Sequence, residues 1–135
     1  AGSWYLPGTD AVVVLNLQKS NYGPRYYINF GLWFLGVGPA NDPKVTHCHL
    51  QTRVERLVDD SCRPSFERLL DLEIEIPDAQ RHEQLLHALE GQLRPFVQVG
   101  QTLAGLATPD GRALLERSLL DGDGQRFLVS SGFTL

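Results

Sequence analysis

Short apolar runs separated by turn sequences fill the first half of the chain. β-Branched and aromatic residues dominate 3–6, 11–19, 25–35 and 45–54, with proline and glycine between the first three runs. The most regular pattern lies at 70–76, where leucine and isoleucine alternate with aspartate and glutamate over seven residues. Alternation with a period of two is typical of a strand with one buried face. We therefore predict five strands in this half.

Leucines at three- and four-residue steps predict helices in the second half. One amphipathic helix is predicted from Asp78 to about Val97. A second is predicted over 110–120, behind an N-cap at Thr108. The remaining segment, 121–135, is predicted to be a turn followed by a tail or a sixth strand.

Strands first and helices afterwards are the order of an α+β domain. We predict an antiparallel sheet of about five strands, connected as a meander, with two or three C-terminal helices packed on one face. The 135 residues fit a single domain. Its parts are predicted as a sheet part at about 3–76, a helical part at about 78–120 and a C-terminal tail or strand at 121–135.

The same alternation separates the two faces of the predicted sheet. Alternate positions from Tyr26 to Phe34 are all apolar, so we expect the helices to pack on that side. The opposite side is either the ordinary solvent face of an antiparallel sheet or a recognition surface. Trp33 and Tyr27 favour recognition because large aromatic side chains usually need cover. Its polar and aromatic positions are Asn16, Gln18, Arg25, Tyr27, Asn29, Trp33, His47, His49, Gln51 and Arg53.

From this face we predict a site for a ligand or a partner. Asparagines at two strand positions support it, because asparagine is a poor strand former. The predicted site residues are Asn16, Gln18, Arg25, Tyr27, Asn29, Trp33, His49 and Arg53.

Charge and composition narrow the classes of partner. The net charge is −4 and the twelve basic residues are scattered, which disfavours a nucleic-acid partner. No segment approaches the roughly 20 apolar residues of a membrane span. With two cysteines and no secretion signal, we expect a cytoplasmic protein. A protein partner and a homo-oligomer both remain open.

Residues suited to catalysis or metal binding are few. His47 and His49 project from the same side of the predicted strand and could bind one metal ion, with Cys62 as a possible third ligand. Only the two histidines are convincing, and zinc sites need at least three protein ligands, so we predict no metal and no cofactor. The first hypothesis is a binding, interaction or regulatory module that uses the polar face. The alternative is a small hydrolase or nucleotide-processing enzyme with a site of His49, Arg53 and Asn29.

Two strands and the segment after them carry a family resemblance. The sequences VLNLQKS at 14–20 and YINFG at 27–31, followed by Cys48-His49 and Arg53, resemble the bacterial family DUF4304, a domain of unknown function. The resemblance implies no activity. It does imply a helix before the first strand, so we expect that residues precede Ala1 in the natural protein.

Overall fold

Turns rich in proline and glycine join the first strands into antiparallel hairpins. The computed structural model describes residues 2–135 and contains one five-stranded antiparallel sheet. Each strand pairs with its neighbours in sequence order, so the predicted meander is confirmed. The strands are β1 (Ser3–Pro7), β2 (Ala11–Lys19), β3 (Tyr26–Phe34), β4 (Leu50–Arg53) and β5 (Leu119–Leu120).

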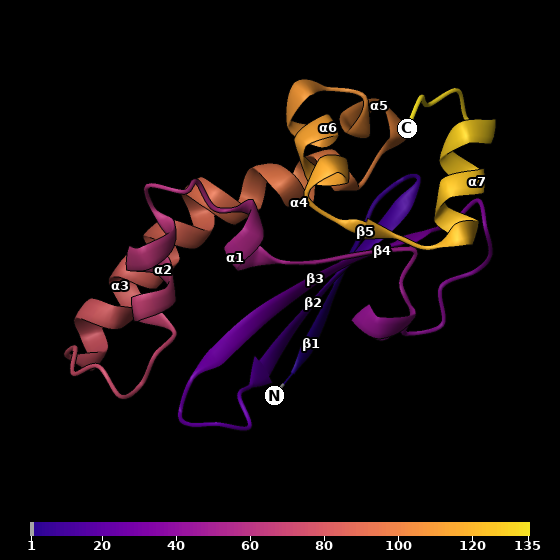
Figure 1. Cartoon of the computed structure of the whole chain (residues 1–135). Coiled ribbons are helices and arrows are strands. Elements are labelled where there is room, and N and C mark those ends of the chain that lie inside the picture. Colours follow the sequence, from indigo (N-terminus) through magenta and orange to yellow (C-terminus); the bar gives the residue numbers. More distant parts are fainter. Residues whose placement is uncertain (1) are drawn as a thin grey trace.

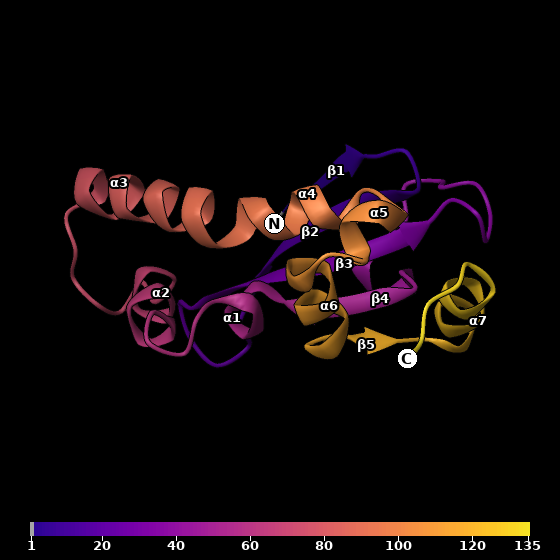
Figure 2. The ribbon, with the colours of Figure 1, turned by 90° about the horizontal axis from the view of Figure 1, so that it is seen from above.

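Most of the chain after β4 is helical, up to the end of α7 at Ser130 (Figure 1). Figure 2 shows that α3, the π-helical turn η2 and α4 form one nearly continuous rod, whose α4 end lies over the sheet while α3 extends beyond it next to α2. The helical segments are η1 (Val45–His47, a 3-10 turn), α1 (Val54–Leu57), α2 (Arg63–Leu69), α3 (Asp78–Ala88), η2 (Leu89–Leu93), α4 (Arg94–Gly100), α5 (Leu103–Leu106), α6 (Pro109–Glu116) and α7 (Gly122–Ser130).

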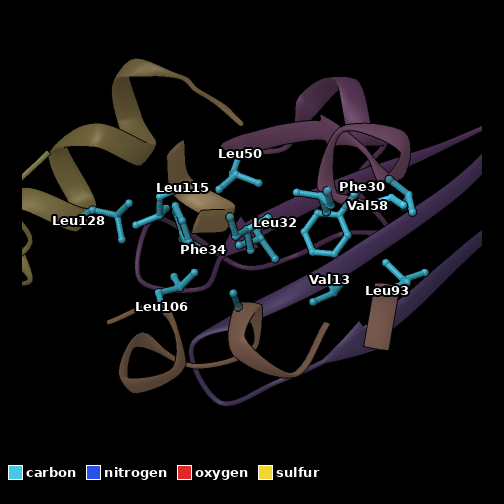
Figure 3. Packing of buried hydrophobic residues seen from close by; sticks show 14 of the residues in the cluster. Val13, Phe30, Leu32, Phe34, Leu50, Val58, Leu93, Leu106, Leu115 and Leu128 are labelled. Atoms are coloured by element: carbon cyan, nitrogen blue, oxygen red, sulfur yellow. The ribbon is translucent and has the colours of Figure 1, made fainter. Parts of the chain in front are cut away.

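The main core lies between the apolar face of the sheet and these helices (Figure 3). Phe30 and Leu32 of β3 are fully buried there. A Cβ atom on Gly100 of α4 would lie 2.9 Å from Leu32, so this glycine allows the helix to approach the sheet closely. The expectation that helices cover the Tyr26–Phe34 side is therefore confirmed, and so is the α+β class.

The prediction of a strand at 70–76 is wrong. Only one antiparallel bridge forms in it, between Arg25 and Asp71, and the rest of the segment is turn, bend and irregular backbone. The Asp71 side chain accepts a hydrogen bond from the Glu73 backbone N–H. The guanidinium of Arg81 donates to the carbonyls of Leu69 and Ile74, at 2.6 Å each. Because these contacts satisfy the backbone locally, the segment needs no neighbouring strand.

The strand predicted at 45–54 is confirmed over Leu50–Arg53 only, since Val45–His47 is a 3-10 turn. The sixth strand considered for the end of the chain does not form. The last part of the chain forms α7 instead of a sixth strand, because the Asp121 carboxylate caps the helix by accepting from Gly124 N–H at 2.7 Å. The fifth strand is Leu119–Leu120, which pairs with β4, so the sheet does not end at residue 76.

Candidate functional site

One half of the polar sheet face is covered by the chain between β3 and β4. In Figure 1 the turn η1 lies on the opposite side of the sheet from α4, α5 and α6. Val45 and Cys48 pack there against Val12 and Val14 in a small second core. Gly31 makes room for this layer, since a Cβ atom there would lie 2.8 Å from the Cys48 sulfur.

Trp33 belongs to this covered half. Its ring packs against the second core, and its Nε1–H donates to the carbonyl of Gly38 at 2.9 Å. The expectation that Trp33 stands on a wet face is therefore wrong, because the loop after β3 supplies the cover that a large aromatic needs.

His49 does not lie on the polar face either. It is 2% exposed, and its Nδ1 accepts a hydrogen bond from Phe34 N–H at 2.9 Å. The ring stacks on Phe34 at 5.7 Å between centroids. Burial lowers the pKa of His49 below its ordinary value of 6.5, while Asp121 and Asp123 oppose this effect. An imidazole that accepts through Nδ1 is neutral and carries its one proton on Nε2. Here the ring serves as an acceptor for the backbone N–H of Phe34.

The other half of the polar face is open and forms a pocket of about 520 Å³, which we name the sheet pocket. The strand register places Asn16 opposite Asn29, and Asn29 opposite Arg53. These three predicted site residues are thus brought together, as period-two alternation required. The lining residues are Ser3, Asn16, Gln18, Asn29, Lys44, Val45, Thr46, Gln51, Thr52, Arg53, Arg56 and Leu119.

The amides on the pocket floor bind one another. The Asn29 Nδ2 group donates to Asn16 Oδ1 at 3.2 Å and to Gln18 Oε1 at 2.9 Å. Asn16 Nδ2 in turn donates to the Ser3 hydroxyl at 3.2 Å. Both Nδ2 hydrogens of Asn29 are therefore used, and among the described residues no hydrogen bond is made to its Oδ1, which stays available as an acceptor.

The Arg53 side chain packs on an aromatic ring, and no ion pair between it and an acidic side chain is found among residues 2–135. Its guanidinium carbon lies 4.2 Å from the centroid of the Tyr27 ring, in a cation–π contact. The ion pairs found among residues 2–135 involve Arg63, Arg94 and Arg126. The sheet pocket is lined by Lys44, Arg53 and Arg56 and by no aspartate or glutamate. It is a locally positive site in a chain of net charge −4.

Two predicted residues lie beside this pocket. Arg25 and Tyr27 line a neighbouring cavity of about 230 Å³, which we name the arginine pocket, and Arg53 and Arg56 line both. Gln18 is exposed and sits at the rim of the floor.

Sequence reasoning missed several lining residues. Gln51 lies on the same side of β4 as Arg53, so alternation alone could have added it to the predicted site residues. Its Nε2 donates to the carbonyl of Thr46 at 3.0 Å. Lys44 and Arg56 come from a loop and a short helix. No local pattern in the sequence indicates that these two side chains meet over the sheet.

Features suited to metal binding or to crossing a membrane are not found among the described residues. Within residues 2–135, His, Cys, Asp and Glu side chains do not gather in groups of three or more that could hold a metal ion. His47 lies on η1 and His49 is buried, so the pair considered from the sequence does not form on one strand face. None of the described helices combines the length and apolar character needed to span a bilayer.

The family model of DUF4304, described as a domain of unknown function, matches residues 1–99. The chain belongs to the DUF4304 family. This match extends past the residues that suggested it, through α3 and η2 into α4. Every residue that lines the sheet pocket except Leu119 lies in the DUF4304 part of the chain. Comparison with curated proteins and with solved structures gave no match.

Proposed function

We propose that this DUF4304 chain is a binding module whose ligand is an anionic molecule seated in the sheet pocket. The observation that carries the proposal is the ordered amide floor beside Arg53, for which residues 2–135 supply no ion pair. Asn29 joins Asn16 and Gln18 through hydrogen bonds, and Arg53 is stacked on Tyr27. Groups fixed before binding lose little conformational entropy when a ligand arrives.

The size and charge of the sheet pocket support a small anionic ligand. Its volume of about 520 Å³ lies within the usual range of about 300–1,000 Å³ for small-molecule sites. Lys44, Arg53 and Arg56 attract negative charge, and the amides below them supply directional donors and acceptors. A ligand with an anionic group and several polar atoms fits both features.

The alternative is a hydrolase or nucleotide-processing enzyme with a site of His49, Arg53 and Asn29. In that site His49 would be the general base. His49 is buried under α7 and is absent from the residues that line the pocket. Those residues include no histidine, cysteine, aspartate or glutamate. The imidazole base that this alternative used for general acid–base chemistry is therefore not in the sheet pocket. We therefore propose binding alone.

Thermal unfolding with a panel of small carboxylates, phosphates, amines and neutral sugars tests the proposal. We expect an anion to raise the stability of the wild type by about 2.7 kcal/mol at a hundredfold excess over its dissociation constant. Asn29→Ala should reduce that gain, because the amide floor loses its central donor.

The matched control is Gln98→Ala, which removes an exposed amide on α4. It should keep the full ligand-induced gain. The proposal fails if no anion stabilises the wild type, or if Asn29→Ala and Gln98→Ala respond alike.

A further inference from the structure

The arginine pocket contains a buried carboxylate oxygen that nothing satisfies. Glu55 of α1 is 8% exposed. Its Oε1 accepts from the backbone N–H of Ile28 at 3.3 Å. Its Oε2 is buried and has no hydrogen-bond partner among the described residues. Buried polar atoms are almost always paired, so an orphan oxygen in the wall of a cavity indicates a missing partner.

Four guanidinium groups line the same cavity as Glu55, those of Arg25, Arg53, Arg56 and Arg63. Arg63 is committed to the protein, since it donates to the carbonyls of Glu55 at 2.7 Å and Val58 at 3.2 Å and pairs with Asp60 at 2.8 Å. Among residues 2–135, no such ion pair is formed by the other three guanidinium groups that line the cavity, those of Arg25, Arg53 and Arg56. Several unpaired guanidinium groups at one cavity are suited to a planar or tetrahedral oxyanion.

We propose that the arginine pocket is a subsite for an oxyanion, a phosphate or a carboxylate, and that Glu55 binds it in the protonated form through an Oε2–H donor. The inference rests on the proposed function, because the oxyanion is the end of the ligand whose polar part lies in the sheet pocket. Arg53 and Arg56 line both cavities and connect them.

The environment of Glu55 determines whether oxyanion binding strengthens or weakens as the pH falls. Burial raises the pKa of Glu55 and the charge of Glu67 raises it further, while the backbone N–H groups of Ile28 and of Glu55 itself and the charge of Arg53 oppose this. An oxyanion adds negative charge and so raises this pKa again; binding then takes up a proton and strengthens as the pH falls. The ionisable groups that line the arginine pocket with Glu55 are Arg25 just before β3, Tyr26 and Tyr27 of β3, Arg53 of β4, Arg56 of α1, and Arg63 and Glu67 of α2.

An NMR titration of the whole chain with sulfate tests the subsite. Sulfate has the shape of phosphate, and its charge stays constant between about pH 5 and pH 8, so any pH dependence belongs to the protein. We expect shifts at the Ile28 backbone amide and the Arg63 side chain. The pKa read from the Glu55 carboxyl carbon should rise with sulfate present. A parallel titration with acetate shows which of the two oxyanions binds more tightly.

Matched variants separate this inference from the proposed function. Arg25→Gln lies in the arginine pocket alone and should weaken sulfate binding about tenfold or more. Lys44→Gln lies in the sheet pocket alone and should leave it unchanged. Glu55→Gln keeps a donor and should bind sulfate with no dependence on pH in this range.

The inference is overturned if sulfate and acetate leave Ile28 and Glu55 unmoved, or if Lys44→Gln weakens sulfate as much as Arg25→Gln does. Either result leaves the sheet pocket to be judged by the Asn29→Ala comparison. Loss of ligand stabilisation in Asn29→Ala with no oxyanion at Glu55 would keep the proposed function and remove the subsite.

Discussion

Asn16 and Asn29 break a local rule of strands and satisfy each other across the sheet. Both are poor strand formers, yet the register places them side by side, and Asn29 Nδ2 donates to Asn16 Oδ1 at 3.2 Å. The side of the sheet on which the two asparagines lie could be predicted from strand alternation alone. The position of His49 could not, because β4 begins one residue later, at Leu50, and alternation does not apply to a residue before the strand.

The buried state of His49 predicts how stability depends on pH. Its pKa is lowered in the folded chain, so below its ordinary value of 6.5 the unfolded chain binds a proton that the folded chain does not. This contribution to stability is present above that value and is lost as the pH falls toward the lower folded pKa. Glu55, with its raised pKa, has the opposite effect.

Replacing His49 by asparagine should therefore reduce the loss of stability between pH 7 and pH 5, because the amide oxygen can accept from Phe34 N–H without titrating. Urea unfolding at several pH values measures this slope. His82→Asn, at an exposed position on α3, is the control and should keep the wild-type slope. An NMR titration of the wild type gives the pKa of His49 directly; a value at or above 6.5 would contradict the account.

At the scale of elements, the alternation of apolar and polar residues predicted the first three strands well and the segment at 70–76 wrongly. The hairpins need nothing beyond their own turns and alternation. Segment 70–76 has the alternation of a strand, but one bridge to Arg25 is all it forms. Its backbone is held by Arg81, which lies on α3. No local pattern can show that a distant guanidinium will replace a neighbouring strand.

Arg81→Ala should destabilise the chain by about 1.5–3 kcal/mol, because two part-buried hydrogen bonds from a charged donor to backbone carbonyls are lost together. Urea unfolding monitored by circular dichroism measures the change. Arg94→Ala removes an exposed ion pair with Glu90 and should change stability by less than about 1 kcal/mol. Equal effects of the two variants would show that Arg81 does not hold this segment.

At the scale of the molecule, one sheet serves two purposes. The helices cover its apolar face (Figure 2), and the chain between β3 and β4 covers half of the other. What stays open is a positive pocket on a chain of net charge −4. The sequence revealed the face and four of the residues on or at the rim of its floor, Asn16, Gln18, Asn29 and Arg53. It could not reveal the walls, since Lys44, Arg56 and Leu119 meet there only through the tertiary fold.

The central claim is that this pocket is where the ligand binds. The most direct measurement is a map of NMR shift changes over the side-chain amides, recorded with the anion that most stabilises the wild type. The account predicts the largest changes at the side chains of Asn29 and Gln51 and at the backbone of Lys44 to Thr46. Changes confined to the groove between α2 and α3, around Cys62 and His87, would contradict it.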